Sequence, residues 1–158
     1  MKPTFNPRWL AFSLALLLGC ADRSFFRVDP PVSAQGISMA LVSQSCEQEP
    51  DVEQQSSFVQ DTLVTVQITN QAPSAATFDS DKVRLAWSKQ VTAPDLRHQL
   101  GTINARDSTR VQLHFTLKGP DAACNNQLTL AWNDAVTLDA RPVPLAPIKF
   151  QLSATADP

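Results

Sequence analysis

The two histidines, His98 and His114, are the side chains most suited to act as general bases near neutral pH. A general base must lie within hydrogen-bond distance of the group that it deprotonates. Period-two spacing places His114 on the same strand face as Arg110, Gln112 and Lys118, where a solvated role is expected. His98 falls in an expected loop, and no G-x-S-x-G segment marks a nucleophile. We therefore predict that the protein is not an enzyme.

Asp79, Ser80 and Asp81 form a cluster of oxygen ligands that a calcium ion could use. Calcium takes about six to eight oxygen ligands, and this stretch offers two carboxylates. An Asx turn leading into a strand explains the triplet better. A copper carrier needs several soft ligands, but Met39 is the one methionine besides Met1. We expect no metal and no cofactor.

The beginning of the chain has the pattern of a secretion signal. Lys2 and Arg8 supply positive charge, and the apolar run over residues 9–18 is too short to span a bilayer. The run ends in Leu17-Leu18-Gly19-Cys20, which resembles the lipobox of bacterial lipoproteins. In that family the cysteine thiol receives a diacylglyceryl group, the chain is cut before the cysteine, and the new amino terminus is acylated. The resemblance implies a signal peptide over residues 1–19 and lipidation of Cys20.

The same resemblance implies a location. Several acyl chains, such as palmitate, anchor a protein stably where a single chain is marginal. The mature protein is therefore expected on the bacterial cell envelope, held by membrane lipid through Cys20. By the sorting rule of such lipoproteins, Ala21 favours the outer membrane, facing the periplasm, although Asp22 follows at the next position. An ordinary secretion signal with an incidental cysteine is the alternative.

Cys46 and Cys124 are the two cysteines that remain once Cys20 carries lipid. In an oxidising periplasm they can form one disulfide. Such a bridge would join the end of the first strand to a hairpin loop between Leu117 and Leu128. The rival role, in metal binding or redox chemistry, lacks a C-x-x-C spacing and a histidine near either cysteine.

Composition favours one compact domain after the predicted signal peptide, rather than a disordered segment or a membrane bundle. The chain has 158 residues, 43% of them hydrophobic and 18% charged. Removing residues 1–19 leaves 139 residues, enough for a single core. It also removes Lys2 and Arg8, so the formal net charge falls from −2 to −4. A nucleic-acid partner would need a basic face, and this balance argues against one.

The mature chain divides into two parts. Residues 20–35 show no periodicity and contain Pro30 and Pro31, so they are predicted to be the lipidated cysteine and a flexible tether. Phe25 and Phe26 in this stretch would either enter the lipid interface or pack on the domain. Residues 36–158 are predicted to form a β-sandwich domain.

Five segments alternate apolar and polar residues with the period of a half-buried strand. Their apolar positions are Val64, Val66 and Ile68; Val83, Leu85 and Trp87; Val111, Leu113, Phe115 and Leu117; Leu128, Leu130 and Trp132; and Ile148, Phe150 and Leu152. The opening segment, Ile37 to Cys46, contains the apolar run 39–42 and is expected to be buried on both faces. A weak edge strand over 96–103 brings the count to about seven.

Turn residues support this division of the chain. Proline cannot donate to a strand ladder, and Pro50, Pro73, Pro94, Pro120, Pro142, Pro144 and Pro147 are expected between strands. Glycine is scarce, so we expect no tight Asn-Gly hairpin. Short strands separated by such loops favour an all-β antiparallel sandwich.

One set of segments resembles a known family. Leu63 to Asn70, Pro73, Phe78, Val83-Arg84-Leu85, Leu100-Gly101 and Val111 to Phe115 are similar to the immunoglobulin-like domain of unknown function found on bacterial lipoproteins. Asp107-Ser108 stands where that family usually has glycine. The resemblance covers roughly residues 36–154, and it implies an immunoglobulin-like sandwich with no catalytic residues. The Cys, Trp, Cys spacing of antibody domains is absent.

These observations lead to two hypotheses of different kinds. The first is a lipid-anchored, non-enzymatic envelope lipoprotein that binds a protein partner or supports an envelope assembly. The alternative is a periplasm-facing lipoprotein that binds a small ligand or an ion. A partner-binding protein should present an open edge strand or an exposed patch. A ligand-binding protein should present a concave pocket with converging polar groups.

Overall fold

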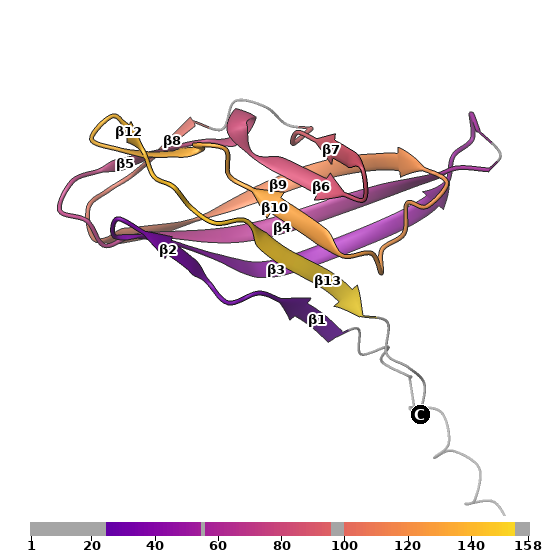
Figure 1. Ribbon diagram of the computed structural model, residues 1–158, viewed down its shortest axis with the longest axis horizontal. Helices are drawn as coiled ribbons and strands as arrows, with labels where there is room; N and C mark the ends of the chain where they lie inside the picture. Colours follow the sequence, from indigo (N-terminus) through magenta and orange to yellow (C-terminus); the bar gives the residue numbers. More distant parts are fainter. Residues whose placement is uncertain (1–24, 55, 96–99, 154–158) are drawn as a thin grey trace, which may run out of the picture.

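A computed structural model describes residues 25–54, 56–95 and 100–153 (Figure 1). Within these ranges the chain forms thirteen β-strands and one 3-10 helix, η1. They are β1 (Phe25–Val28), β2 (Val32–Ala34), β3 (Ile37–Pro50), β4 (Phe58–Asn70), β5 (Ala76–Asp79), η1 (Ser80–Lys82), β6 (Arg84–Trp87), β7 (Gln90–Thr92), β8 (Leu100–Ile103), β9 (Asp107–Gly119), β10 (Leu128–Ala131), β11 (Val136–Leu138), β12 (Arg141–Pro142) and β13 (Ile148–Ser153).

The strands form three antiparallel sheets. A five-stranded sheet has the order β1-β13-β10-β6-β7, and a second sheet, the long-stranded sheet, has the order β2-β3-β4-β9. A third sheet, β12-β11-β5-β8, lies at one end of the molecule (Figure 1). The all-β antiparallel sandwich is therefore confirmed, but the count of about seven strands was too low. Most of the additional strands have only two to four residues, which is too short to show a period-two pattern in the sequence.

The strand β4 forms the centre of the long-stranded sheet, with β3 on one side and β9 on the other. It pairs with β9 without interruption from Phe58 opposite Gly119 to Asn70 opposite Asp107. Burial alternates strictly from Gln60 onward, as period two requires. This alternation confirms the predicted inward face of Val64, Val66 and Ile68 and extends it in both directions.

The opening segment does not have two buried faces. In β3, Ile37, Met39 and Leu41 are buried and their neighbours are not. The register with β4 then shifts between Leu41 and Ser43, and Val42 is 40% exposed at this bulge. The extra residue of a bulge breaks the alternation, which is why the sequence showed an apolar run there.

The predicted tether is shorter than expected, because part of it belongs to the sheets. Strand β1 pairs with β13, and β2 pairs with the start of β3. Phe25 and Phe26 thus lie in a strand, opposite Ser153 and Leu152. Strand β1 gave no signal in the sequence because its four residues are too few to show a period-two pattern.

One prediction about turns is corrected, and one tight turn is added to the predicted set. Gln35 and Gly36, both with positive φ, form a two-residue connection between β2 and β3, so a tight hairpin exists without Asn-Gly. Pro50 and Pro142 lie inside strands rather than between them. Pro50 is the last residue of β3, and Pro142 lies in an edge strand, so neither removes a bond from the middle of a sheet.

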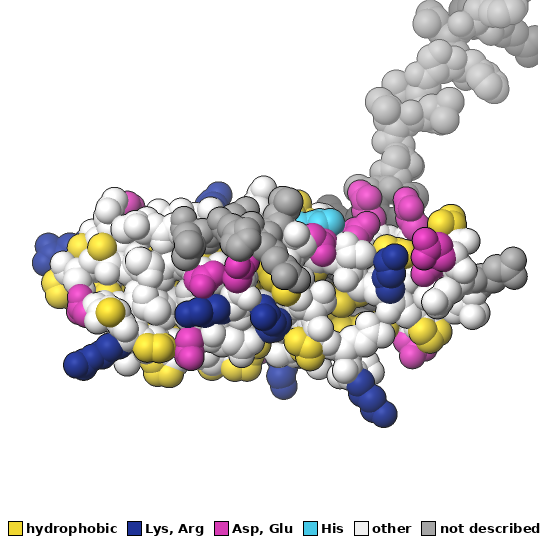
Figure 2. All heavy atoms as spheres, turned by 90° about the horizontal axis from the view of Figure 1, so that it is seen from above, with side chains coloured by type: hydrophobic (Ala, Val, Ile, Leu, Met, Phe, Trp, Pro, Cys, Tyr) yellow, Lys and Arg dark blue, Asp and Glu magenta, His cyan; other side chains and the backbone are white. Residues whose placement is uncertain are grey.

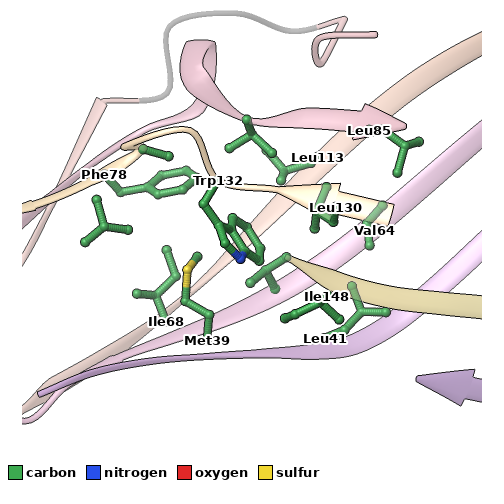
Figure 3. Close-up of a cluster of buried hydrophobic side chains, with 14 of the residues drawn as sticks. Met39, Leu41, Val64, Ile68, Phe78, Leu85, Leu113, Leu130, Trp132 and Ile148 are labelled. Carbon is green, nitrogen blue, oxygen red and sulfur yellow. The ribbon is translucent and has the colours of Figure 1, made fainter. Parts of the chain in front are cut away.

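The core fills the space between the sheets (Figure 3). Met39, Val64 and Ile68 of the long-stranded sheet meet Leu85, Leu130 and Ile148 of the five-stranded sheet, with Phe78 from the end sheet. Trp132 lies among them at 2% exposure, and its indole Nε1 donates to the carbonyl oxygen of Ala146 at 2.9 Å. A buried indole needs such an acceptor, so this bond fixes the segment that leads into β13.

Candidate functional site

Cys20, the predicted lipidation site, lies outside the residues that the structure describes, as do the signal peptide and His98. The first described residue is Phe25 of β1. Among the described residues, no helix has the length and apolarity to cross a bilayer. Lipidation therefore stays a prediction from the lipobox.

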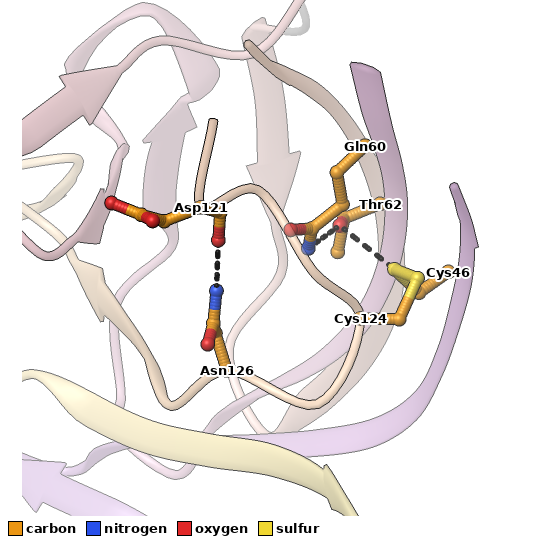
Figure 4. Close-up of a disulfide and its surroundings, with 6 residues drawn as sticks. All are labelled: Cys46, Gln60, Thr62, Asp121, Cys124 and Asn126. Carbon is orange, nitrogen blue, oxygen red and sulfur yellow. Dashed lines mark hydrogen bonds between the residues drawn. A yellow bond between two sulfur atoms is a disulfide. The ribbon is translucent and has the colours of Figure 1, made fainter. Parts of the chain in front are cut away.

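The predicted disulfide joins Cys46 of β3 to Cys124, with a Cα–Cα distance of 5.7 Å (Figure 4). Cys46 lies opposite Thr62 of β4, and Cys124 lies between β9 and β10. The loop that holds Cys124 was expected to be a hairpin loop, but it instead connects the long-stranded sheet to the five-stranded sheet. The bridge therefore links the β9–β10 connection, which joins the two sheets, to strand β3.

The interior next to the disulfide is polar. Gln60 Nε2 donates to Thr62 Oγ1 at 2.9 Å, and this hydroxyl points to Cys46 Sγ at 3.8 Å (Figure 4). Gln60 is fully buried, yet its Oε1 has no hydrogen-bond partner. Both polar atoms of the Gln44 side chain are also buried and without a partner. Unpaired buried amides cost free energy, so this end of the sandwich is less well satisfied than the core.

His114 belongs to a hydrogen-bonded cluster on the outer face of the long-stranded sheet. Its Nδ1 lies 2.7 Å from Asp95 Oδ2, and its Nε2 lies 3.9 Å from Asp61 Oδ1. Thr116 Oγ1 lies 2.7 Å from Asp61 Oδ1 and 2.8 Å from Asp95 Oδ2. The four side chains therefore form one connected group.

The sheet register explains most of this cluster. Asp61 and Thr116 are directly opposed on β4 and β9, so their side chains share a face. His114 is two residues before Thr116 on that face. Asp95 arrives from the segment after β7, where its backbone N–H donates to the carbonyl oxygen of His114 at 2.8 Å. The sequence correctly predicted the outward face but missed Asp95, because no local pattern brings that segment to β9.

The arrangement does not resemble a nucleophilic site. A threonine hydroxyl carries one proton, and Thr116 directs its hydroxyl at carboxylates rather than at the imidazole. The side chains of His114, Asp61 and Asp95 are 39%, 47% and 36% exposed. Among the described residues, no three His, Cys, Asp or Glu side chains are grouped to hold a metal ion. The geometry is that of a surface hydrogen-bond network.

The Asp79-Ser80-Asp81 triplet forms the predicted Asx turn. Asp79 precedes η1, and its Oδ1 accepts a hydrogen bond from the backbone N–H of Asp81 at 3.0 Å. The carboxylate thereby accepts a hydrogen bond from a backbone N–H at the start of the turn. The local role of the triplet is to lead the chain from β5 into β6.

A hollow of about 550 Å³ lies on the outer face of the long-stranded sheet. It is lined by Val42, Ser43, Thr65, Arg110, Val111 and Gln112. Small-molecule sites are usually closed enough to bury most of the ligand. This hollow opens broadly to solvent, so it can offer contacts on one side of a ligand only.

Acidic side chains gather at the disulfide end of the molecule. Figure 2 shows magenta Asp and Glu side chains around the histidine and at the adjoining end. The acidic residues of the β3–β4 hairpin are Glu47, Glu49, Asp51, Glu53 and Asp61. Residues 28–81 contain no Lys, Arg or His, so the hairpin carries no cation of its own. The sequence therefore indicates a locally negative region, although the net charge of the whole chain is small.

No protein-family model matches the chain, and a comparison with curated proteins finds no significant match. The chain is similar to a solved protein described as the X-ray structure of Northeast Structural Genomics Consortium target SoR45. The two are 12% identical, with a TM-score of 0.48, over 78% of this chain and 90% of that chain. A likeness of this strength supports no functional conclusion, and the fold described above rests on the observed strand pairing.

Proposed function

We propose that the protein is a lipid-anchored, non-enzymatic lipoprotein of the bacterial envelope whose immunoglobulin-like sandwich binds a protein partner. The observation that carries partner binding is the exposed edge of β3. This strand has fourteen residues, and β2 pairs with only Ile37 to Met39 on its outer side. An unpaired strand edge is a template for association with another chain.

The lipobox carries the anchoring part of the proposal. Phe25, the first residue of β1, follows Cys20 by five positions. At roughly 3.3–3.6 Å per residue, the linker between them reaches at most about 18 Å. A lipidated Cys20 would therefore hold the sandwich close to the membrane surface, where the partner must also be accessible. The outer membrane, facing the periplasm, remains our expected location.

The absence of enzyme activity is also part of the proposal. It is supported by the His114 cluster, in which the imidazole contacts carboxylates and, within the described ranges, no hydroxyl is hydrogen-bonded to it. Within the described part of the chain, His114 is the one histidine. A catalytic role would need a nucleophile within hydrogen-bond distance of that base.

Photo-crosslinking in living cells of the source bacterium tests partner binding. A photo-reactive amino acid replaces, one at a time, Gln48 at the exposed β3 edge, Gln67 on the outer face of β4, and Lys149 on β13 as a comparison position. A discrete crosslinked protein is expected from the long-stranded sheet and not from β13. If no position on the domain yields a protein adduct, the partner-binding proposal is wrong.

The hollow that includes Arg110 gives a second candidate, the binding of a small anionic ligand. Arg110, Thr65 and Gln112 would supply its polar contacts. Titration with a panel of small carboxylates and phosphates, followed by the melting temperature, separates this candidate from the first. A rise that disappears in Arg110→Ala would favour ligand binding. The broad opening of the hollow makes a rise of less than about 2 °C the expected result, because a weakly held ligand stabilises little.

A further inference from the structure

Strand β3 has one side without a partner over most of its length. From Ala40 to Pro50 it pairs with β4, whereas β2 stops opposite Met39. Among the described residues, no other backbone hydrogen bond reaches this side of the strand. Ser43, Ser45, Glu47 and the last three residues of the strand are all exposed. In an antiparallel pair, every second residue of β3 bonds to β4 and the residues between them direct their backbone N–H and C=O groups to the open side. These outward groups can accept an added strand.

Pairing between the β3 edges of two copies of this chain is electrostatically unfavourable. Antiparallel pairing of β3 with its own copy would bring Glu47 and Glu49 of one chain close to the same residues of the other. Like charges placed opposite each other destabilise a strand pair. The edge is therefore protected against self-association and available to a different partner.

The charge next to the edge is uniformly negative. Glu47 lies directly opposite Asp61 of β4, so both carboxylates are on the outer face. Glu49 is two residues further along that face. The cation nearest in register is Lys118 of β9, opposite Val59 on the far side of β4. A strand added beside β3 would meet acidic side chains on this face, and lysine or arginine would complement them.

The inward face of the same segment carries a different signal. Gln44 lies opposite Val64, which is fully buried, so its side chain lies on the interior face. Both of its amide atoms are buried and lack a partner. A polar side chain on a strand next to β3 would stand beside Gln44 and could pair with that amide. The open backbone edge, the acidic side chains and the unpaired Gln44 amide thus all lie along the same segment of β3.

We propose that the free edge of β3, from Ser43 to Pro50, binds an extended segment of a partner protein as an additional strand. Lysine or arginine side chains of that segment lie opposite Glu47 and Glu49, and a polar side chain lies beside Gln44. This inference rests on the proposed partner-binding function and names the chemistry of the partner. Backbone pairing supplies much of the affinity, and the alternating side chains supply specificity.

A synthetic peptide of ten residues, alternating lysine and threonine, tests the inference. The full-length secreted chain in a neutral detergent is titrated against the labelled peptide, and fluorescence anisotropy gives the Kd. The same peptide with N-methyl groups on alternate backbone amides keeps its charge but cannot complete a strand ladder. At least tenfold weaker binding of the methylated peptide is expected, and hydrogen exchange should show new protection over residues 43–50.

Two charge-reversal variants provide the matched comparison. Glu47→Lys removes an acid at the edge, and Asp107→Lys makes the same change of charge at the opposite end of the long-stranded sheet. Glu47→Lys is expected to weaken binding at least tenfold, and Asp107→Lys less than twofold. Glu47→Lys should not unfold the domain, because a lysine there can pair with Asp61. Melting curves of both variants confirm that the fold is intact.

Several results would overturn the inference. Equal affinity of the two lysine peptides, or no protection of β3, would mean that charge alone drives binding. A concentration-dependent dimer with β3 protected would make a second copy the occupant. The positions that crosslink show whether only this inference fails or the proposed function fails with it. Adducts from Gln67 but not from Gln48 would keep the partner and exclude the β3 edge, whereas no adduct anywhere would exclude both.

Discussion

Asn70, the last residue of β4, donates from Nδ2 to the carbonyl oxygen of Ile103, the last residue of β8, at 3.1 Å. The same amide group also lies within hydrogen-bond distance of the carbonyl oxygens of Ser74 and Asn104. Its Oδ1 accepts from the backbone N–H of Ala72 at 3.0 Å. Asn70 is fully buried, so a single side chain links the long-stranded sheet to the end sheet.

Replacing this amide should destabilise the domain. In Asn70→Ala, buried backbone groups lose their partners, and each unsatisfied group costs about 1–3 kcal/mol. We expect a loss of about 2–3 kcal/mol and a melting temperature lower by roughly 8–12 °C for a domain of this size. Asn104→Ala is the matched control, since only its backbone carbonyl takes part. Equal melting temperatures for the two variants would show that Asn70 is not a structural link.

The disulfide should contribute stability without being required for folding. Cys46 and Cys124 are separated by 78 positions, and closing such a loop is worth about 4 kcal/mol in the chain-entropy model. The double variant Cys46→Ser, Cys124→Ser should melt roughly 10–15 °C lower and keep a β-rich far-UV spectrum. Wild-type protein treated with a reductant is the control and should lose the same amount. Two free thiols from Cys46 and Cys124 in denatured, unreduced protein would contradict the bridge.

Lipidation of Cys20 should decide where the protein is found. Cys20→Ser removes the thiol that accepts the lipid, so an uncut precursor or a mislocalised protein is expected. Metabolic labelling with a fatty-acid analogue should mark the wild type alone. The variant Cys46→Ser serves as a control and should label normally. Label in Cys20→Ser protein that still fractionates with membranes would disprove the lipobox interpretation.

The pairing of His114 with Asp95 should be weak. Both side chains are more than one-third exposed, and exposed ion pairs typically contribute about 0.2–1 kcal/mol. A double-mutant cycle with His114→Ala and Asp95→Ala should therefore give a coupling free energy of at most about 1 kcal/mol. A value above about 2 kcal/mol would show that this contact holds the segment after β7 in place.

Several features followed from the sequence because they depend on local order. The alternation that made Val64, Val66 and Ile68 inward-facing is a property of any extended chain, and β4 and β9 follow it through their core-facing length. The Asx turn at Asp79 involves neighbours two residues apart. The partners of the disulfide could be named because Cys46 and Cys124 are the two cysteines that remain once Cys20 is assigned to the predicted lipobox.

Other features were decided by the tertiary structure, since they depend on which distant strands meet. The short segment of β1 reads as part of a tether in the sequence, but pairing with β13 makes it part of a sheet. Asp95 reaches His114 only because the segment after β7 bonds to the edge of β9. The open edge of β3 exists because β2 has only three residues and begins at Val32, opposite Met39. Period-two patterns fix which face of a strand is buried, but strand neighbours are chosen by packing across the whole core, and that choice leaves no local trace.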